Sequence, residues 1–232
     1  MMKEIFFIDL HVHSVYSSDG KASLLELFKQ ARKIGLNGFA LTDHNEIRGI
    51  EKARKVGKDF PEVLFVPGVE VTTAEGHILA LNVEEVIPTF LPISETVEKI
   101  HALGGIAVAA HPYRLWSGIG EKAVLENIEI FDAIEVFNAR NLFAGNRKSQ
   151  ELAKKTGKAE TGGSDCHIVR ELAAGYTLFK NPLSSAEDVV EEILKGRSRA
   201  GNGKFGRVTK AQIFIQGTHC VGSWVKRGFK DI

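Results

Sequence analysis

Short apolar runs alternate with segments of helical periodicity along almost the whole chain. The apolar runs predict strands at residues 5–10, 38–42, 63–66, 77–83, 106–110, 133–137, 159–161 and 176–179. Between most of them, apolar residues recur every three or four positions and predict helices at 23–34, 46–56, 94–103, 121–130, 144–156 and 184–194. A further short run at 212–215 is compatible with a final strand.

Local signals mark where two of these helices begin and where one ends. Ser23 followed by Glu26 is a capping box, in which each side chain bonds the backbone N–H of the other residue. Ser184 and Glu187 have the same spacing before the last helix. Gly35 suits a helix exit, because glycine readily adopts the left-handed conformation found there.

The strand–helix alternation predicts a parallel sheet, and about seven such units approach a complete barrel. We therefore expect an α/β fold in which residues 1–195 form a single barrel domain. Residues 196–232 would be a basic C-terminal segment that packs on the barrel or extends from it, with the glycine-rich stretch 196–206 as a linker.

Polar residues stand where the predicted strands end. They are His11 and His13, Asp43 and His44, Glu70, His111, Asn138, Asp165 and His167. The C-terminal ends of parallel barrel strands meet at one rim, where active sites are built. We therefore expect these side chains to come together.

The residue types suit metal ions. Side chains two positions apart in a strand point the same way, so His11 and His13 can reach one ion together. Asp165 and His167 repeat that spacing. Imidazole with carboxylate suits zinc, iron or manganese, and a carboxylate such as Glu70 can bridge two ions.

Each ligating histidine also needs a hydrogen-bond acceptor for its other ring nitrogen, and Asp9 or Asp43 is placed to supply one. Taken singly, these residues have ordinary explanations: Asp43 suits a helix cap, Asp165 an Asx turn, and His77 the edge of a strand. Their common position at strand ends makes the metal-site interpretation the stronger one.

Composition and charge exclude some classes of protein. The 232 residues are 44% hydrophobic and 25% charged, as in ordinary globular proteins, and no apolar run approaches the ~20 residues needed to cross a bilayer. Two cysteines make no disulfide framework, and we expect a cytoplasmic protein. Residues 193–232 hold nine Lys or Arg but one acid, so this tail carries +8 and the rest −7 of the net +1. We interpret the tail as a solvent-exposed segment whose positive charge balances the negative charge of residues 1–192.

Six stretches in order resemble the PHP (polymerase and histidinol phosphatase) family. They are DLHVHSVYSSDG, LTDHN, PGVEVTTAEGHILAL, GGIAVAAHP, AIEVFNARN and TGGSDCH, and they span residues 9–167. The resemblance implies a distorted (β/α)7 TIM-like barrel of the PHP type that holds two or three divalent metal ions, Zn, Mn or Fe. It also implies a metal-dependent phosphoesterase.

The resemblance assigns ligands motif by motif. The first ion would take His11, His13, Glu70 and Asp165, the second Glu70 and His111, and the third Asp19, His44 and His167. Asn138 stands where many members have a histidine, which leaves water or His77 to complete the set of ligands around the second ion. Asp19 stands where some members have a histidine, which favours manganese or iron over zinc at the third ion.

The expected reaction is hydrolysis of a phosphorylated small molecule, a nucleotide or an oligonucleotide. Arg114 and Arg140 follow two of the strand ends and are the candidate catalytic residues that would bind phosphate. No membrane partner is expected, and an oligomer is compatible with the sequence.

Three alternatives remain open. A metal-dependent amidohydrolase also begins with His-x-His, but it would normally close with a lone aspartate rather than Asp165-x-His167. A 3′–5′ exonuclease-like activity fits the basic tail. A non-catalytic metal-binding regulator would have lost several ligands, whereas here only Asn138 departs from the pattern.

Overall fold

The computed structural model describes residues 5–142 and 144–209. Within them, nine strands form one sheet in the order β7-β6-β5-β4-β3-β2-β1-β8-β9. The strands are β1 (Phe6–Val12), β2 (Gly38–Leu41), β3 (Leu64–Thr72), β4 (His77–Leu81), β5 (Ile106–Ala109), β6 (Ala133–Asn138), β7 (Ala159–Gly163), β8 (Gly175–Phe179) and β9 (Ser198–Asn202). The ends of the sheet meet, because β7 packs against β1, β8 and β9 and a parallel bridge joins Val12 to Cys166.

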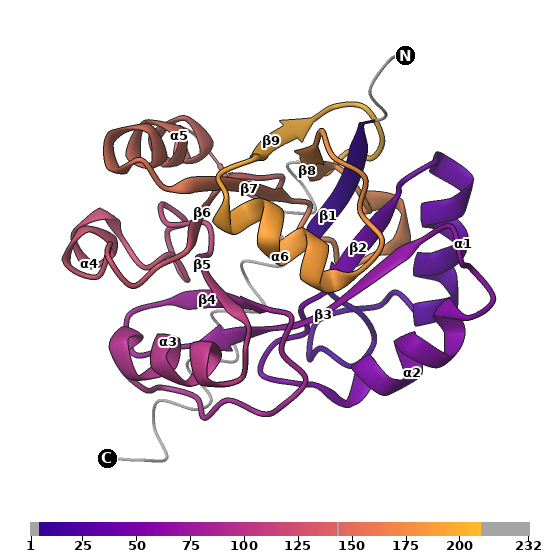
Figure 1. Ribbon diagram of the computed structural model, residues 1–232, viewed down its shortest axis with the longest axis horizontal. Helices are drawn as coiled ribbons and strands as arrows, with labels where there is room; N and C mark the ends of the chain where they lie inside the picture. The colour runs from indigo at the N-terminus through magenta and orange to yellow at the C-terminus, as the bar shows by residue number, and fades with distance from the viewer. Residues whose placement is uncertain (1–4, 143, 210–232) are drawn as a thin grey trace.

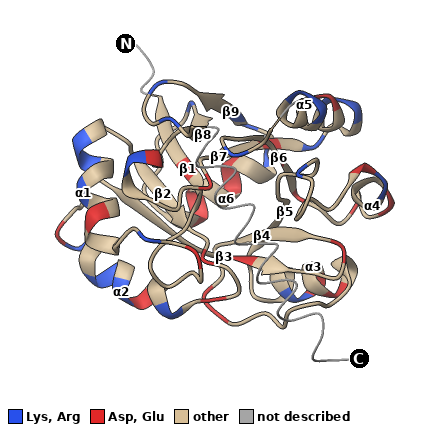
Figure 2. Cartoon of the chain, turned by 180° about the vertical axis from the view of Figure 1, so that it is seen from behind, with Lys and Arg blue, Asp and Glu red and all other residues tan. Residues whose placement is uncertain are grey.

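Helices surround this nearly closed barrel. They are α1 (Leu24–Ile34), α2 (Arg48–Gly57), α3 (Ile93–Ala102), α4 (Glu121–Glu126), α5 (Gly145–Thr156), the short 3-10 helix η1 (Val169–Glu171) and α6 (Ala186–Leu194). Figure 1 shows α1 and α2 beside one half of the barrel and α3, α4 and α5 beside the other half. Helix α6 lies across one end of the strands. Many positions along α1, α2 and α5 are Lys, Arg, Asp or Glu (Figure 2).

The predicted α/β barrel is confirmed, but its strands are not all parallel. The pairs β1–β2, β2–β3, β5–β6 and β6–β7 are parallel, whereas β4 runs antiparallel to both β3 and β5. Only residues 73–76 join β3 to β4, which is too short for a helical crossover and makes a hairpin. Strand β8 is antiparallel to β1 and β9.

The barrel interior is apolar at the end that α6 covers. Ile8 and Leu10 on β1 and Val66 on β3 pack there with Val189 and Ile193 of α6. All five side chains are almost fully buried. Two further cores lie between the outside of the sheet and the surrounding helices. The apolar faces predicted from sequence therefore account for the packing of the barrel at this end.

The helix signals are partly confirmed. The capping box of Ser23 and Glu26 is present, and Gly35 ends α1 in the left-handed conformation, with φ 71°. At α6 the box lies one residue later than predicted, between Ser185 and Asp188. The reason is that the chain becomes helical only at Ala186, so the hydroxyl that reaches the third helical N–H belongs to Ser185.

The segment after residue 195 begins inside the sheet. Residues 198–202 form β9, although their glycine content predicted a linker. Gly201 lies under the ring of Tyr176, where a Cβ atom would come within 2.4 Å of the ring, so the glycine serves close packing. The predicted strand at 212–215 lies outside the described residues. No helix in the described residues has the length and apolar character to cross a membrane.

Candidate metal centre

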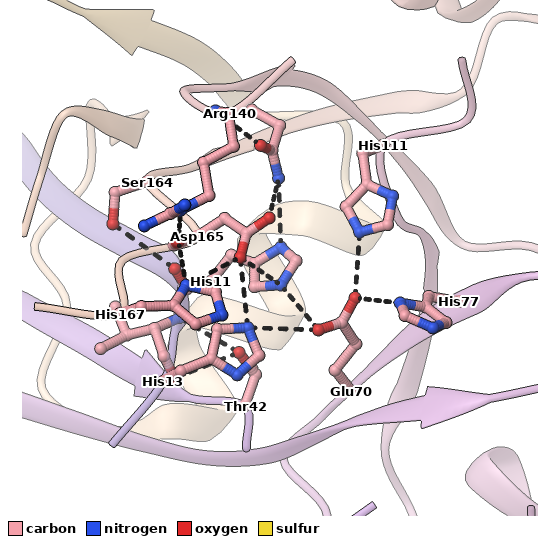
Figure 3. Close-up of polar contacts among 12 residues, drawn as sticks. His11, His13, Thr42, Glu70, His77, His111, Arg140, Ser164, Asp165 and His167 are labelled. Atoms are coloured by element: carbon pink, nitrogen blue, oxygen red, sulfur yellow. Dashed lines mark hydrogen bonds and ion pairs between the residues drawn. The ribbon is translucent and has the colours of Figure 1, made fainter. Parts of the chain in front are cut away.

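The carboxylate of Glu70, near the C-terminal end of β3, is surrounded by imidazoles. Its Oε1 lies 2.9 Å from His111 Nε2 and 2.7 Å from His77 Nδ1. Its Oε2 lies 3.1 Å from His11 Nε2 and 3.2 Å from His13 Nε2. Figure 3 shows Glu70 between these rings. His11 lies on β1 and His77 on β4, whereas His13 follows the end of β1 and His111 follows the end of β5. Sequence-distant residues thus converge on one carboxylate, as the rim argument predicts.

The local fold of β1 explains how its two histidines reach this point. The pairing of β1 with β2 is irregular between Asp9 and Val12. Such an irregularity re-aims side chains, so Leu10 packs in the apolar interior while His11 and His13 both reach the centre. Both rings therefore lie against the same oxygen of Glu70, and their binding of one ion stays a prediction.

A second group of donors lies beside the first. His167 Nε2 is 3.0 Å from Asp19 Oδ2, and His44 Nε2 is 3.6 Å from the same oxygen. The ring of His13 stacks on that of His167, with centroids 4.4 Å apart, and joins this group to the Glu70 cluster. His44 also joins the two, since its Nδ1 lies 3.1 Å from Glu70 Oε2.

The donor set fits divalent ions. Ligand atoms lie within 4.8 Å of one another in four overlapping groups: His13, Asp19, His44 and His167; His11, His13 and Glu70; His11, His111 and Asp165; and His44, Glu70 and His77. Most of these side chains are buried. His13 Nε2 is buried between oxygens of Glu70 and Asp165, at 3.2 and 3.3 Å, yet it makes no well-aligned hydrogen bond. A buried nitrogen with no proper partner, facing two carboxylates, is what a metal ligand requires.

The electrostatics of the centre are strongly perturbed. Burial alone would raise the pKa of Glu70, but the surrounding imidazoles hold that pKa well below its ordinary value. Burial opposes the charged form of His13, but the neighbouring carboxylates of Asp165 and Glu70 raise its pKa to about 9. Burial and neighbouring positive charge lower the pKa values of His111 and His167 to about 4. Groups in one site whose pKa values are driven apart indicate a functional centre.

The two predicted arginines lie in different surroundings. Arg114 reaches the centre: its Nη2 is 2.6 Å from Asp165 Oδ2 and 2.8 Å from Asn138 Oδ1. Arg140 does not reach the rim expected for it. Its Nε donates to the backbone carbonyl of Asp165 at 2.6 Å, and its Nη2 to Glu171 at 2.5 Å. The guanidinium of Arg140 is therefore buried against the backbone of Asp165, and its side chain is 6% exposed.

Asn138, predicted as an additional donor, is engaged by protein groups. Its Nδ2 donates to Glu135 at 3.1 Å and to Asp165 at 3.2 Å, and its Oδ1 accepts from Arg114. The amide links a carboxylate of the centre to the guanidinium.

Asp9 and Asp43 were predicted to accept hydrogen bonds from ligating rings, and the structure corrects this. Asp43 accepts from the backbone and hydroxyl of Ser14, at 2.6 and 2.7 Å. Asp9 accepts from Ser164 and from the backbone of Ala173, so it ties β1 to the chain after β7. Both carboxylates therefore bond serine hydroxyls and backbone N–H groups instead of imidazoles.

The ring acceptor that the sequence reasoning missed is Glu135 on β6. Its Oε1 lies 2.9 Å from His11 Nδ1, and its Oε2 accepts from the backbone N–H of His111 at 2.8 Å. Its side chain is fully buried. The available signal was a charged residue inside the otherwise apolar run AIEVF, since carboxylates are seldom buried without a specific partner.

Comparison with known proteins agrees with this geometry. Residues 144–198 match the PHP-associated family. The chain is also 37% identical over 161 residues to an uncharacterized protein of Methanocaldococcus jannaschii, covering 63% of this chain and 94% of that protein. The chain belongs to the PHP family.

Two further PHP-related proteins extend the comparison. A phosphoribosyl 1,2-cyclic phosphate 1,2-diphosphodiesterase of Eggerthella lenta is 36% identical over 101 residues, which are 40% of this chain and 38% of that enzyme. A two-domain protein of Bacteroides vulgatus that contains a PHP-like metal-dependent phosphoesterase has the same fold. The TM-score is 0.69 at 19% identity, over 86% of this chain and 65% of that one.

Proposed function

We propose that this protein is an enzyme that hydrolyses phosphate esters with a di- or trinuclear centre of divalent ions. The observation that carries the proposal is the sharing of donors at the barrel rim. Glu70 belongs to two of the four potential ligand groups and His13 to two, so adjacent ions would be bridged or directly neighbouring. Adjacent ions are the arrangement that suits phosphoryl transfer to water.

The ligands we propose are those implied by the family motifs. His11, His13, Glu70 and Asp165 would hold one ion, Glu70 and His111 a second, and Asp19, His44 and His167 a third. His77, whose Nδ1 lies 2.7 Å from Glu70, is placed to complete the second set. Imidazole and carboxylate donors suit Zn, Mn or Fe.

Bound ions of this kind lower the pKa of a coordinated water and neutralise charge on the phosphoryl oxygens. The protein's own contribution begins with Glu135, which accepts from His11 Nδ1 and so leaves His11 Nε2 free to act as a ligand. Arg114 lies at the edge of the centre, with its Nη2 against Asp165 and its side chain 21% exposed. A guanidinium there would donate two hydrogen bonds to a phosphoryl group.

The substrate class we propose is a phosphomonoester or a small nucleotide or oligonucleotide. The Eggerthella lenta relative is, by name, a diphosphodiesterase that acts on a cyclic phosphate of a phosphoribosyl compound. The two sequences align over residues that make up 40% of this chain, which supports shared phosphate-ester chemistry.

The test is hydrolysis by the full chain after removal of metals and reloading with Mn²⁺, Zn²⁺ or Fe²⁺. p-Nitrophenyl phosphate, bis-p-nitrophenyl phosphate, short oligonucleotides and a chromogenic amide would be assayed together, with metal content measured by mass spectrometry. We expect two or three ions per chain and turnover of at least one phosphate ester. Turnover of the amide alone would instead establish the amidohydrolase alternative.

His11→Ala is the decisive variant, and His101→Ala is its matched control. His101 lies on α3 and its side chain is 42% exposed, paired with Asp132 and remote from Glu70. We expect His11→Ala to lose metal and activity while His101→Ala keeps both. If His11→Ala bound as much metal and turned over as fast as the wild type, the proposed function would be wrong.

A further inference from the structure

The chain segment that carries Asp165 and His167 has an uncommon backbone. Asp165 has φ 54°, in the left-handed region, which is uncommon for residues other than glycine and which aspartate and asparagine adopt more readily than most. On one side this segment is held by β1: Asp165 N–H donates to His11 O at 2.8 Å, and His13 N–H donates to Cys166 O at 3.0 Å. A left-handed residue carries a conformational cost, so further contacts on the other side of the segment would help to keep this turn.

Arg140 and Glu171 hold that other side. Arg140 Nε donates to Asp165 O at 2.6 Å, and the same carbonyl accepts from His167 Nδ1 at 2.8 Å. Glu171 Oε2 accepts from Arg140 Nη2 at 2.5 Å and from the backbone N–H of His167 at 3.1 Å. The Arg140–Glu171 ion pair thus connects the backbone carbonyl of Asp165 to the backbone N–H of His167.

These contacts also orient the ring of His167. A carbonyl oxygen can only accept, so the Nδ1 atom that faces Asp165 O carries a proton, and the ring presents its Nε2 atom to Asp19. That Nε2 is the atom that lies 3.0 Å from Asp19 Oδ2, inside the second group of donors. The orientation of the ring and the atom it presents are therefore set by the same carbonyl that Arg140 holds in place.

The ion pair is a poor source of stability. Glu171 is fully buried and Arg140 is 6% exposed, so both charges lose most of their hydration. Arg140 Nη1 and Glu171 Oε1 have no hydrogen-bond partner in the described part of the chain. An incompletely bonded buried pair seldom repays the cost of desolvation, and apolar residues of similar size often replace such pairs without loss of stability. A role in positioning accounts for it better.

We propose that Arg140 and Glu171 are positioning residues for the metal centre. They hold the left-handed turn at Asp165 so that its carboxylate and the Nε2 atom of His167 face the ions, and Arg140 binds no substrate phosphate. The inference rests on the proposed function only in taking Asp165 and His167 as ligands. Its test measures metal binding rather than turnover.

The main variant is Arg140→Met with Glu171→Leu, which removes both charges and keeps volume. Mn²⁺ binding to metal-stripped full chain would be measured by isothermal titration calorimetry, and thermal unfolding by circular dichroism. We expect unfolding at the wild-type temperature or higher, with Mn²⁺ affinity about 10- to 100-fold weaker, as for other groups that orient ligands. Glu171→Gln keeps both acceptor contacts and should retain most of the affinity.

The matched control is Arg197→Met with Glu192→Leu. Arg197 and Glu192 form a second Arg–Glu pair at the end of α6, which contacts none of the candidate ligands. We expect it to leave Mn²⁺ affinity unchanged. Wild-type affinity in the Arg140/Glu171 double variant would overturn the proposal, as would a loss of inorganic phosphate binding without any loss of Mn²⁺ affinity.

A second readout covers the case in which the double variant does not fold. Nitrogen NMR of the imidazoles in metal-free wild type and in Arg140→Lys reports whether Nδ1 of His167 carries a proton. We expect Nδ1 to be protonated throughout in the wild type, because Asp165 O faces it, and only partly protonated in Arg140→Lys. Unchanged Nδ1 protonation in a folded Arg140→Lys would contradict the proposal. Weaker Mn²⁺ binding in a protein that hydrolyses no phosphate ester would support the positioning role and refute only the proposed function.

Discussion

The two ends of the barrel interior are built by the same strands from opposite kinds of side chain. On β1, Ile8 packs in the apolar end and His11 faces the centre. On β3, Val66 lies in the apolar end and Glu70 in the centre. Both ends are buried, so burial alone does not distinguish structural from functional residues.

The difference lies in what each end does for the free energy of folding. The apolar end, covered by α6, gains from removal of hydrocarbon from water. The polar end gathers imidazoles and carboxylates whose desolvation opposes folding and whose mutual contacts only partly compensate. We therefore expect substitutions at the polar end to remove activity, and those at the apolar end to remove stability.

The largest expected effect is at the centre. Glu70→Gln keeps the size of the side chain but removes the charge that faces His11, His13 and the neighbouring rings. Loss of several kcal/mol of transition-state stabilisation should lower kcat by about 1,000-fold or more. Steady-state assays with the best phosphate ester would measure this, with exposed Glu85→Gln as the control. A variant that kept a tenth of the activity would break the distinction between the two ends.

The apolar end should respond in the opposite way. Ile193→Ala deletes a fully buried side chain of α6 and should lower the free energy of unfolding by about 2–5 kcal/mol. Its kcat at a temperature where it is folded should not change. Urea unfolding and activity would be compared with Leu194→Ala, the next residue, which is 57% exposed. Reduced kcat in folded Ile193→Ala would show that the ends are coupled.

Metal binding should stabilise the polar end selectively. Mn²⁺ at about 100 times its Kd should raise the free energy of unfolding by about 2.7 kcal/mol, because it binds only the folded chain. Hydrogen exchange should slow most around His11 and Glu70 and least at Val189 in α6. Urea unfolding with Mn²⁺ and with EDTA measures the first effect. If Mn²⁺ raised the free energy of unfolding of Glu70→Gln by the same amount, the ions would be bound elsewhere.

The smallest effect concerns how α6 begins. Ser185→Ala removes the hydroxyl that caps the helix and should cost about 1 kcal/mol of stability at pH 7. Activity should not change, because α6 lies at the apolar end. Urea unfolding measures the cost.

The pH dependence of the same cap has a defined sign. The hydrogen bond from the Ser184 hydroxyl lowers the pKa of Asp188 below its ordinary 3.8. A lowered folded-state pKa means that this contribution to stability is present above pH 3.8 and is lost as the pH falls through the folded value. The destabilisation caused by Asp188→Asn should therefore shrink below pH 3.8. An equal cost at pH 7 and pH 3 would contradict the assignment.

Much of the fold could be predicted because its signals are local. The apolar periodicity that marks α1 and the capping box at Ser23 depend on residues within a few positions of each other. One failure was local and the other depended on tertiary packing. The shift of the α6 cap to Ser185 depends on where the helix begins, and β9 was hidden because packing under Tyr176 requires glycine at Gly201.

The candidate ligands could be predicted because their spacing and their place after apolar runs are written in the chain. Their partners could not, since a partner is set by three-dimensional proximity across strands. Glu135 stands 124 residues from His11, and Glu171 lies 31 residues from Arg140. Asp9 and Asp43 looked equally suitable as ring acceptors until the fold turned them toward backbone N–H groups.

The sequence by itself determined the kind of chemistry, since histidines and carboxylates at successive strand ends of a barrel meet at one rim. Only the tertiary structure decided which charged groups face the candidate centre and which bond the backbone behind it. The physical reason is that a side chain's residue type defines what it can bind, whereas its role depends on the nearest buried partner. For Arg114 that partner is a carboxylate of the centre, and for Arg140 it is Glu171 behind it.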